Sequence, residues 1–254
     1  MLSYQHIYHA GSCADVYKHA ALAILLTQLT TKARPLTYFE THAGRGVYNL
    51  SRPESQKTQA EPQNITQLMF ADKIPHDHPY YHVIRKTQSL YGASYYPGSP
   101  EIARLLLRPY DQLHLMELHP QEYAALKKNM RAPNIHIHRR NGYEGVMALS
   151  PPPIRRGLVL IDPPYEVKTE YQQVATFIIT LHHRWPQAVI LLWYPILKEK
   201  YHLPLKRKLQ KAQLPAFWQQ EVLFAQRDWN GLLGCGLICV HLPFHTKKYL
   251  KINI

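Results

Sequence analysis

Short apolar runs alternate along the chain with longer segments in which apolar positions recur every three or four residues. The short runs predict buried strands and the longer segments predict helices. Strands are expected at 36–40, 113–118, 134–138, 157–162 and 188–193. Helices are expected at 15–29, 101–107, 121–129, 143–149 and 171–183. Because strands and helices alternate, the pattern predicts a doubly wound α/β domain, with helices covering a parallel sheet.

Two parts of the chain depart from this alternation. The apolar runs 217–225 and 233–242 have no long helix between them, so we expect them to close the sheet as antiparallel strands. Residues 51–95 contain no convincing strand and only two helix-like pieces, at 65–70 and 80–90. We therefore expect a single domain, 1–254, with a helical insertion at 51–95. The insertion follows the loop of the first strand, where ligand sites of this fold lie, so it either helps to bind a substrate or is decoration.

The composition points to a nucleic-acid partner. The 254 residues include 30 Lys plus Arg against 17 Asp plus Glu, a net charge of +13 that attracts polyanions. The alternative is a basic surface that only keeps the protein soluble. With 46% hydrophobic and 19% charged residues, the chain is neither disordered nor fibrous. No apolar stretch is long enough for a membrane span, no export signal is visible, and the three cysteines form no CxxC pair, so we expect a reducing cytoplasm.

The most specific chemical signal is an apolar strand that ends directly in Asp162, Pro163, Pro164 and Tyr165. Two consecutive prolines fix φ and lack N–H donors, so the chain leaves the strand in a stiff turn. The Asp162 carboxylate and the Pro163 carbonyl are acceptors, and Tyr165 offers an aromatic face. Two acceptors on the hydrogens of a purine amino group would direct the nitrogen lone pair toward an electrophile while the base is stacked. A strand that simply stops at prolines would not account for the whole tetrad.

A glycine-containing loop supplies the second signal. Glu40 ends the first predicted strand, and Gly44 and Gly46 follow it, where glycine lets the backbone approach a ligand closely. The pair is weak evidence alone, because its spacing is neither the dinucleotide nor the P-loop fingerprint. Together with Asp-Pro-Pro-Tyr, it is the signature of amino-directed methyltransferases that use S-adenosylmethionine. Glu117, at the end of another predicted strand, is a candidate acceptor for ribose hydroxyls, the alternative being a surface carboxylate.

Six blocks of sequence, in order, resemble the RlmJ family. They are Met1 to Gly11, Ala14 to His19, Thr41 to Gly44, Tyr95 to Pro100, Glu117 to Pro120 and Arg155 to Glu166. The resemblance extends from residue 1 to about Pro195 and is weaker beyond. It implies a Rossmann-like methyltransferase fold with a small helical insertion. It also implies methylation of N6 of one adenine in bacterial 23S ribosomal RNA, with S-adenosylmethionine as the cofactor.

The resemblance further implies roles for individual residues. Cofactor contacts are expected from Lys18, His19, His42, Gly44, Ser99, Glu117, Asn141, Gly142 and Asp162. Asp162, Pro163, Pro164 and Tyr165 are expected to form the catalytic corner, and Tyr4 and His6 to close over the target base or the cofactor. We expect Lys18 to meet the carboxylate end of the cofactor or an RNA phosphate. From the residues alone, His19 and His42 would be helix-face and loop histidines satisfied by backbone partners.

The leading hypothesis is a monomeric enzyme that acts on naked or incompletely assembled 23S ribosomal RNA and needs no metal. The target adenine must leave its stack to reach Asp162. His136 and His138 share one face of a predicted strand but lack further ligands at suitable spacing. One alternative is a DNA adenine-N6 methyltransferase, which would use the same acceptors. Another is a non-catalytic RNA-binding relative, suggested by Asn141, where the family has Asp, and by an end at Ile254 that is early for the family.

Overall fold

A seven-stranded sheet forms the centre of the computed structural model, which describes residues 5–55, 64–70, 73–224 and 231–250. The strands are β1 (Thr37–Glu40), β4 (Gln112–Met116), β5 (Ile135–His138), β6 (Gly157–Ile161), β7 (Ala188–Leu197), β8 (Trp218–Leu223) and β9 (Leu232–Val240). Their order is β5-β4-β1-β6-β7-β9-β8. The first five pair in parallel, and β9 runs antiparallel between β7 and β8. This topology confirms the predicted Rossmann-like α/β fold and its antiparallel closure.

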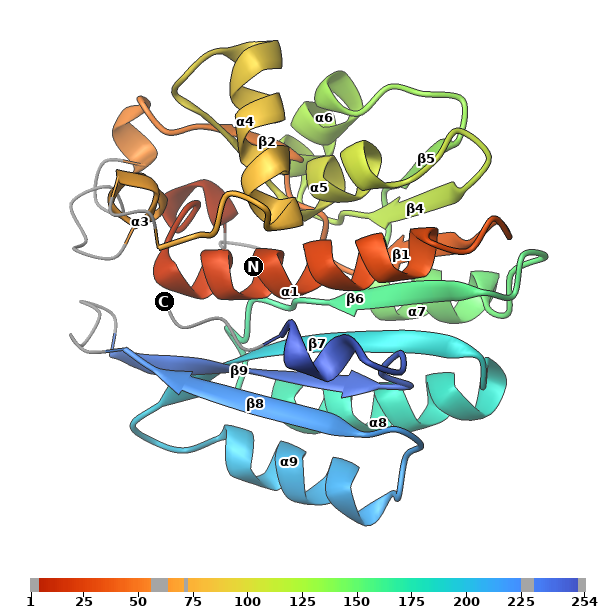
Figure 1. Cartoon of the computed structure of the whole chain (residues 1–254). Helices are drawn as coiled ribbons and strands as arrows, with labels where there is room; N and C mark the ends of the chain where they lie inside the picture. Colours follow the sequence, from red (N-terminus) through yellow and green to blue (C-terminus); the bar gives the residue numbers. More distant parts are fainter. Residues whose placement is uncertain (1–4, 56–63, 71–72, 225–230, 251–254) are drawn as a thin grey trace.

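Helices cover both faces of the sheet (Figure 1). Successive residues of a strand point to opposite faces of the sheet. Because helices cover both faces, the residues on each face of the central strands must be apolar. Leu158 and Leu160 of β6 belong to one core, whereas Val159 and Ile161 belong to the other. The first core contains α1 (Cys13–Thr30), α4 (Pro79–Tyr91), α5 (Ser99–Leu106) and α6 (Pro120–Asn129). The second contains α7 (Gly142–Leu149), α8 (Glu170–Arg184) and α9 (His202–Lys211).

Helix α1 is buried on nearly all sides and lies against the middle of the sheet, roughly along the direction of the strands (Figure 1). It is apolar over most of its surface, as expected for a helix that lies inside a core. Ser12 caps it by accepting the backbone N–H of Asp15 at 3.3 Å. Three charged or polar side chains of this helix, Asp15, Lys18 and His19, are nevertheless buried, each less than 4% exposed. None of the described helices is long and apolar enough to cross a membrane.

A second, two-stranded sheet borders the expected insertion. Strand β2 (Val47–Asn49) pairs antiparallel with β3 (Tyr95–Pro97), so both ends of the segment lie together. Between them come the short helix η2 (Pro53–Ser55), α3 (Ile65–Phe70) and α4, and the last two match the expected helical pieces. The strand pair was not predicted, because three-residue strands are too short to show a period.

Three further elements differ from the expectations. Strand β7 continues to Leu197, four residues beyond the expected end at Trp193. The added residues, which include Pro195, pair antiparallel with β9. Helix α9 follows β7 and was not predicted, since six of its ten residues are basic or polar and only a narrow stripe is buried. The expected strand 217–225 ends at Leu223, and Ala225 lies outside the described residues.

Gly142 allows α7 to begin directly against the loop after β1. A methyl group at this position would collide with the backbone carbonyl of Thr41. We expect Gly142→Ala to lower the free energy of unfolding by roughly 1–3 kcal/mol, the usual cost of overpacking a tight contact. Urea denaturation measures this change. Ala148→Ser, at an exposed position of the same helix, is the control and should shift stability by less than about 0.5 kcal/mol. Equal stability of the two variants would contradict the close contact.

Candidate active site

A cleft of about 590 Å³ opens at the carboxyl ends of the parallel strands. Ligands of doubly wound sheets bind at this edge, because loops after adjacent strands diverge there. Nearly all the residues predicted to form the site line this cleft: His6, Lys18, His19, His42, Gly44, Ser99, Glu117, Asn141, Gly142, Asp162, Pro163, Pro164 and Tyr165. Tyr4 lies outside the described residues. The structure thus brings together groups that come from seven separate segments of the chain.

The Asp-Pro-Pro-Tyr segment forms a rigid corner at the end of β6. Tyr165 has a φ of 53°, in the left-handed region that few non-glycine residues adopt. Its hydroxyl donates to the backbone carbonyl of Trp193 at 3.0 Å, and its ring lies 4.4 Å from that of Tyr171. The side chain is only 8% exposed. Tyr165 is therefore held from both ends, and only a small part of it faces the cleft.

Trp193 is a lining residue that the sequence analysis placed only in a strand. Strands β6 and β7 pair in parallel with Ile161 opposite Leu192, so the next residues, Asp162 and Trp193, lie side by side. The indole is partly buried, lines the cleft and lies 6.2 Å from the Tyr165 ring. An aromatic residue in the expected strand next to Asp-Pro-Pro-Tyr was the available signal. It went unrecognised because apolar strand residues are usually core.

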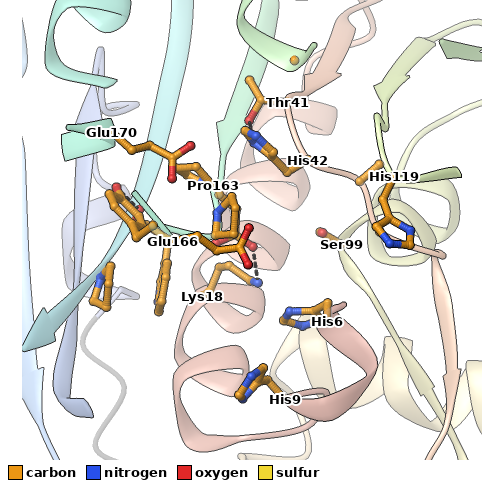
Figure 2. A pocket seen from close by; sticks show the side chains of 18 of the residues that line it. His6, His9, Lys18, Thr41, His42, Ser99, His119, Pro163, Glu166 and Glu170 are labelled. Atoms are coloured by element: carbon orange, nitrogen blue, oxygen red, sulfur yellow. Dashed lines mark hydrogen bonds and ion pairs between the residues drawn. The ribbon is translucent and has the colours of Figure 1, made fainter. Parts of the chain in front are cut away.

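Lys18 connects two carboxylates at the bottom of the cleft. Its ammonium group lies 2.5 Å from Oδ2 of Asp162 and 2.9 Å from Oδ1 of Asp15, and its side chain is 4% exposed. In Figure 2, Lys18 points from α1 toward Pro163 at the end of β6, and His6 lies next to it. Burial alone would lower the pKa of Lys18, but the two carboxylates raise it, so the amine stays charged. Lys18 thus binds protein carboxylates here, whereas the sequence analysis expected a cofactor carboxylate or a phosphate.

Glu117 and the glycine loop form a second polar group in the cleft. Gly44, with a φ of 59°, donates its N–H to Oε2 of Glu117 at 2.8 Å. The N–H of His119 donates to Oε1 at 2.7 Å. Burial raises the pKa of Glu117, and these two donors oppose the change. Since a carboxylate offers about four lone pairs, Glu117 is oriented by the backbone and retains acceptor capacity toward the cleft.

Ser99 and Glu40 form a buried pair beside this group. The Ser99 hydroxyl donates to Oε1 of Glu40, and the Tyr38 hydroxyl donates to Oε2 at 2.9 Å. Burial raises the pKa of Glu40 to about 8. A hydroxyl has only one hydrogen. Ser99, an expected cofactor contact, therefore presents its oxygen to the cleft as an acceptor while its hydrogen serves Glu40.

The two predicted histidines have side-chain partners rather than the backbone partners expected from the residues alone. Nδ1 of His19 lies 2.7 Å from the Tyr96 hydroxyl, and Nδ1 of His42 lies 2.9 Å from the Thr41 hydroxyl. Burial lowers the pKa of His19, and it lowers the pKa of His42 to about 4. Both imidazoles are therefore neutral at pH 7. His42 also packs edge-on against Tyr143, with ring centroids 5.4 Å apart.

Asn141 serves as the N-cap of α7. Its Oδ1 accepts the backbone N–H groups of Tyr143 at 2.9 Å and Glu144 at 3.2 Å. The sequence analysis expected Asn141 to contact the cofactor, but the carbonyl oxygen of this side chain is already used by the helix. What Asn141 retains toward the cleft is its amide nitrogen, a donor.

The strand histidines lie away from the cleft, at one edge of the sheet. His136 and His138 lie on the same face of β5, as the two-residue period of a strand predicts. Both stack on His114, whose ring centroid is 4.7 Å from that of His136 and 5.5 Å from that of His138. His114 in turn stacks on Phe39. Within the part of the chain that the structure describes, no three His, Cys, Asp or Glu side chains are grouped to hold a metal ion.

The strand order, the antiparallel β9 and a cleft with a glycine loop and an Asp-Pro-Pro-Tyr corner define a Rossmann-like methyltransferase. The model of the family "Ribosomal RNA large subunit methyltransferase D, RlmJ" matches residues 33–252. The chain belongs to this RlmJ family.

Individual relatives agree with the family match. Ribosomal RNA large subunit methyltransferase J of Escherichia coli is 34% identical, and the protein of the same name from Haemophilus influenzae is 35% identical. Each alignment covers 99% of this chain and 91% of the relative. A crystal structure of a Legionella pneumophila protein is similar, with a TM-score of 0.84 and 33% identity. It covers 96% of this chain and 91% of that one.

Glu40 gives the site a measurable pH dependence. Its folded-state pKa, about 8, is above the ordinary value of 4.5, so raising the pH between these values ionises the unfolded chain first and favours unfolding. The wild-type free energy of unfolding, relative to Glu40→Gln, should therefore fall by roughly 1.4 kcal/mol per pH unit between about pH 5 and 8. Urea denaturation across this range measures the difference. Glu144→Gln, at an exposed carboxylate, is the control, and parallel curves for wild type and Glu40→Gln would contradict the assignment.

Proposed function

We propose that this protein methylates the N6 amino group of one specific adenine in 23S ribosomal RNA, with S-adenosylmethionine as the methyl donor. The observation that carries the proposal is the position of the Asp162–Pro163 acceptors in the same cleft as Gly44 and Glu117. The names of the relatives, which are ribosomal RNA large subunit methyltransferases, support the substrate class. The adenine would be flipped out of its stack into the Asp-Pro-Pro-Tyr corner.

The described residues fit the cofactor. When bound, S-adenosylmethionine supplies an electrophilic methyl group on a positively charged sulfur. Glu117, fixed by two backbone donors, has acceptors left for ribose hydroxyls. Gly142 lets the first turn of α7 approach the loop after β1 without a side chain in between. Neutral His42 adds no positive charge near a cation. The two carboxylates of Asp15 and Asp162 carry more negative charge than the one positive charge of Lys18 neutralises. The bottom of the cleft therefore favours a cationic ligand.

The catalytic corner supplies acceptors for the target amino group. Lys18 binds Oδ2 of Asp162, which leaves Oδ1 as the oxygen that accepts from the amino group. The Pro163 carbonyl is the second acceptor, held by the fixed φ of the prolines. Hydrogen bonds to both would favour a pyramidal nitrogen with its lone pair free to attack. The proton lost from nitrogen then goes to Asp162 or to water. Trp193 and Tyr165 offer aromatic surface against the base.

The net charge of +13 suits a polyanionic substrate. Because a paired or stacked base cannot reach the bottom of a cleft, the proposal includes naked or incompletely assembled ribosomal RNA as the substrate. It also includes a monomeric enzyme in the cytoplasm, and a single domain in which residues 51–95 form an insertion. Duplex DNA carries the same adenine amino group, so DNA methylation is the competing outcome of the substrate test.

Asp162→Ala tests the catalytic corner. We expect methyl transfer to fall by at least about 100-fold, the usual cost of removing a charged group aligned with the reacting atoms. S-adenosylmethionine binding, measured by calorimetry, should weaken but stay detectable, because one negative charge is lost while Glu117 keeps its backbone donors and Lys18 keeps Asp15 as its partner. Glu144→Gln, an exposed carboxylate outside the cleft, is the control for transfer. Undiminished transfer by Asp162→Ala would remove Asp162 from the reaction.

A substrate comparison tests the proposed function directly. Purified protein is incubated with S-adenosylmethionine carrying a labelled methyl group and with naked 23S ribosomal RNA, assembled large subunits or duplex DNA. We expect label in the naked RNA, in one N6-methyladenosine located by mass spectrometry, and little in assembled subunits or DNA. Label in DNA alone would show a DNA methyltransferase. Absence of cofactor binding in calorimetry would favour the non-catalytic RNA-binding alternative.

A further inference from the structure

Asp15 contacts more cleft groups than its place in the sequence suggests. It lies in the first turn of α1 and is 2% exposed. Its Oδ2 accepts from the backbone N–H of Gly11 at 3.1 Å and lies 2.9 Å from Nε2 of His6. Its Oδ1 lies 2.9 Å from the ammonium group of Lys18 and 3.8 Å from Nε2 of His19. One buried carboxylate therefore ties the N-terminal segment to the polar side of α1.

This arrangement connects Asp15 to the catalytic corner through Lys18. The spacing of three residues puts Lys18 one turn after Asp15 on the same face of α1. The ammonium group then spans from Asp15 to Asp162, which lies 144 positions after Lys18 in the chain. His6 enters the cleft beside Lys18 (Figure 2). Without the Asp15 carboxylate, Lys18 and His6 would lose the group that places them relative to each other.

Another buried aspartate shows what a purely structural carboxylate looks like in this fold. Asp111 is 0% exposed and binds the backbone N–H of Leu36 and the guanidinium group of Arg108. These contacts hold loops at the opposite, amino end of the parallel strands, and Asp111 does not line the cleft. Asp15 instead binds groups that do line it.

We propose that Asp15 is a positioning residue for methyl transfer, whose carboxylate holds His6 and Lys18 in place and, through Lys18, orients Asp162. The inference rests on the proposed function. It assigns Asp15 an electrostatic and geometric role, with no proton passing along the chain of contacts. A relay would require Lys18 to give a proton to Asp15, yet both carboxylates stabilise its ammonium form and raise its pKa. Burial alone would raise the pKa of Asp15, but His6, Lys18 and His19 lower it well below its ordinary value.

Asp15→Asn tests the role, because Asn has nearly the same shape but no charge. We expect kcat on ribosomal RNA to fall by about 10- to 100-fold, as misplacement of catalytic groups produces, with a smaller change in KM. S-adenosylmethionine binding should weaken, because the cleft loses one negative charge, but should stay detectable. Asp111→Asn is the matched control: we expect it to lower the melting temperature and to leave the kcat of the folded protein unchanged. A wild-type kcat in folded Asp15→Asn would overturn the proposal.

A double-mutant cycle separates positioning from general stability. If Asp15 acts through His6, the combined Asp15→Asn, His6→Gln variant should lose much less kcat than the product of the two single losses. Multiplicative losses would overturn the coupling to His6. Should Asp15→Asn fail to fold, Asp15→Glu keeps the charge and displaces the carboxylate by one methylene. Reduced kcat in folded Asp15→Glu supports the proposal, and an unchanged kcat refutes it.

Hydrogen exchange provides a readout that does not depend on the substrate. In the free protein, we expect Asp15→Asn to accelerate amide exchange in residues 5–12 and to leave exchange in α8 unchanged. Unchanged exchange in residues 5–12 would refute the anchoring of this segment by Asp15. Absence of methyl transfer by the wild-type protein, by contrast, would refute the proposed function and leave the exchange result to decide the anchoring.

Discussion

The ion pair between Lys18 and Asp162 is the interaction on which the cleft depends. A buried ammonium group is costly unless carboxylates neutralise it, and Lys18 has two of them, Asp15 and Asp162. The contact fastens the most buried helix of the first core to the end of β6, the strand that leads into the Asp-Pro-Pro-Tyr corner. Because one charge is shared between two carboxylates, the bottom of the cleft keeps a negative balance. The same feature therefore provides both rigidity and electrostatic character.

The polar groups of the cleft are held by partners that leave selected atoms for a ligand. Backbone donors orient Glu117, Glu40 takes the Ser99 hydrogen, and α7 takes the Asn141 oxygen. Burial keeps His42 neutral. Each side chain enters the cleft with part of its hydrogen-bonding capacity already used, so little reorganisation is needed when a ligand arrives. Such preorganisation is the physical basis for assigning transfer chemistry to this site.

Much of the fold could be predicted from local pattern, because strands buried on both faces read as continuous apolar runs. Strands β1, β4, β5, β6 and β7 were expected within a few residues of their observed positions, apart from the extension of β7. We did not predict the short strands β2 and β3 or the polar helix α9. Neither a three-residue strand nor a helix with a narrow apolar stripe produces a clear hydrophobic periodicity in the sequence. Trp193 was not recognised as a site residue, because apolar strand residues are usually core and its neighbour in the site, Asp162, follows another strand.

The sequence by itself determined the alternation of strands and helices, the stiff Asp-Pro-Pro-Tyr corner and the glycine loop, because each is encoded by residues close together in the chain. Only the tertiary structure decided which atoms meet. Lys18 binds Asp162 across 144 positions and Ser99 binds Glu40 across 59, and no local pattern encodes a contact at such separations. Asp15 looked like an ordinary residue of a helical first turn until folding surrounded it with His6, Lys18 and Gly11. Composition and spacing specify what a side chain can do, but its partners depend on how distant segments pack.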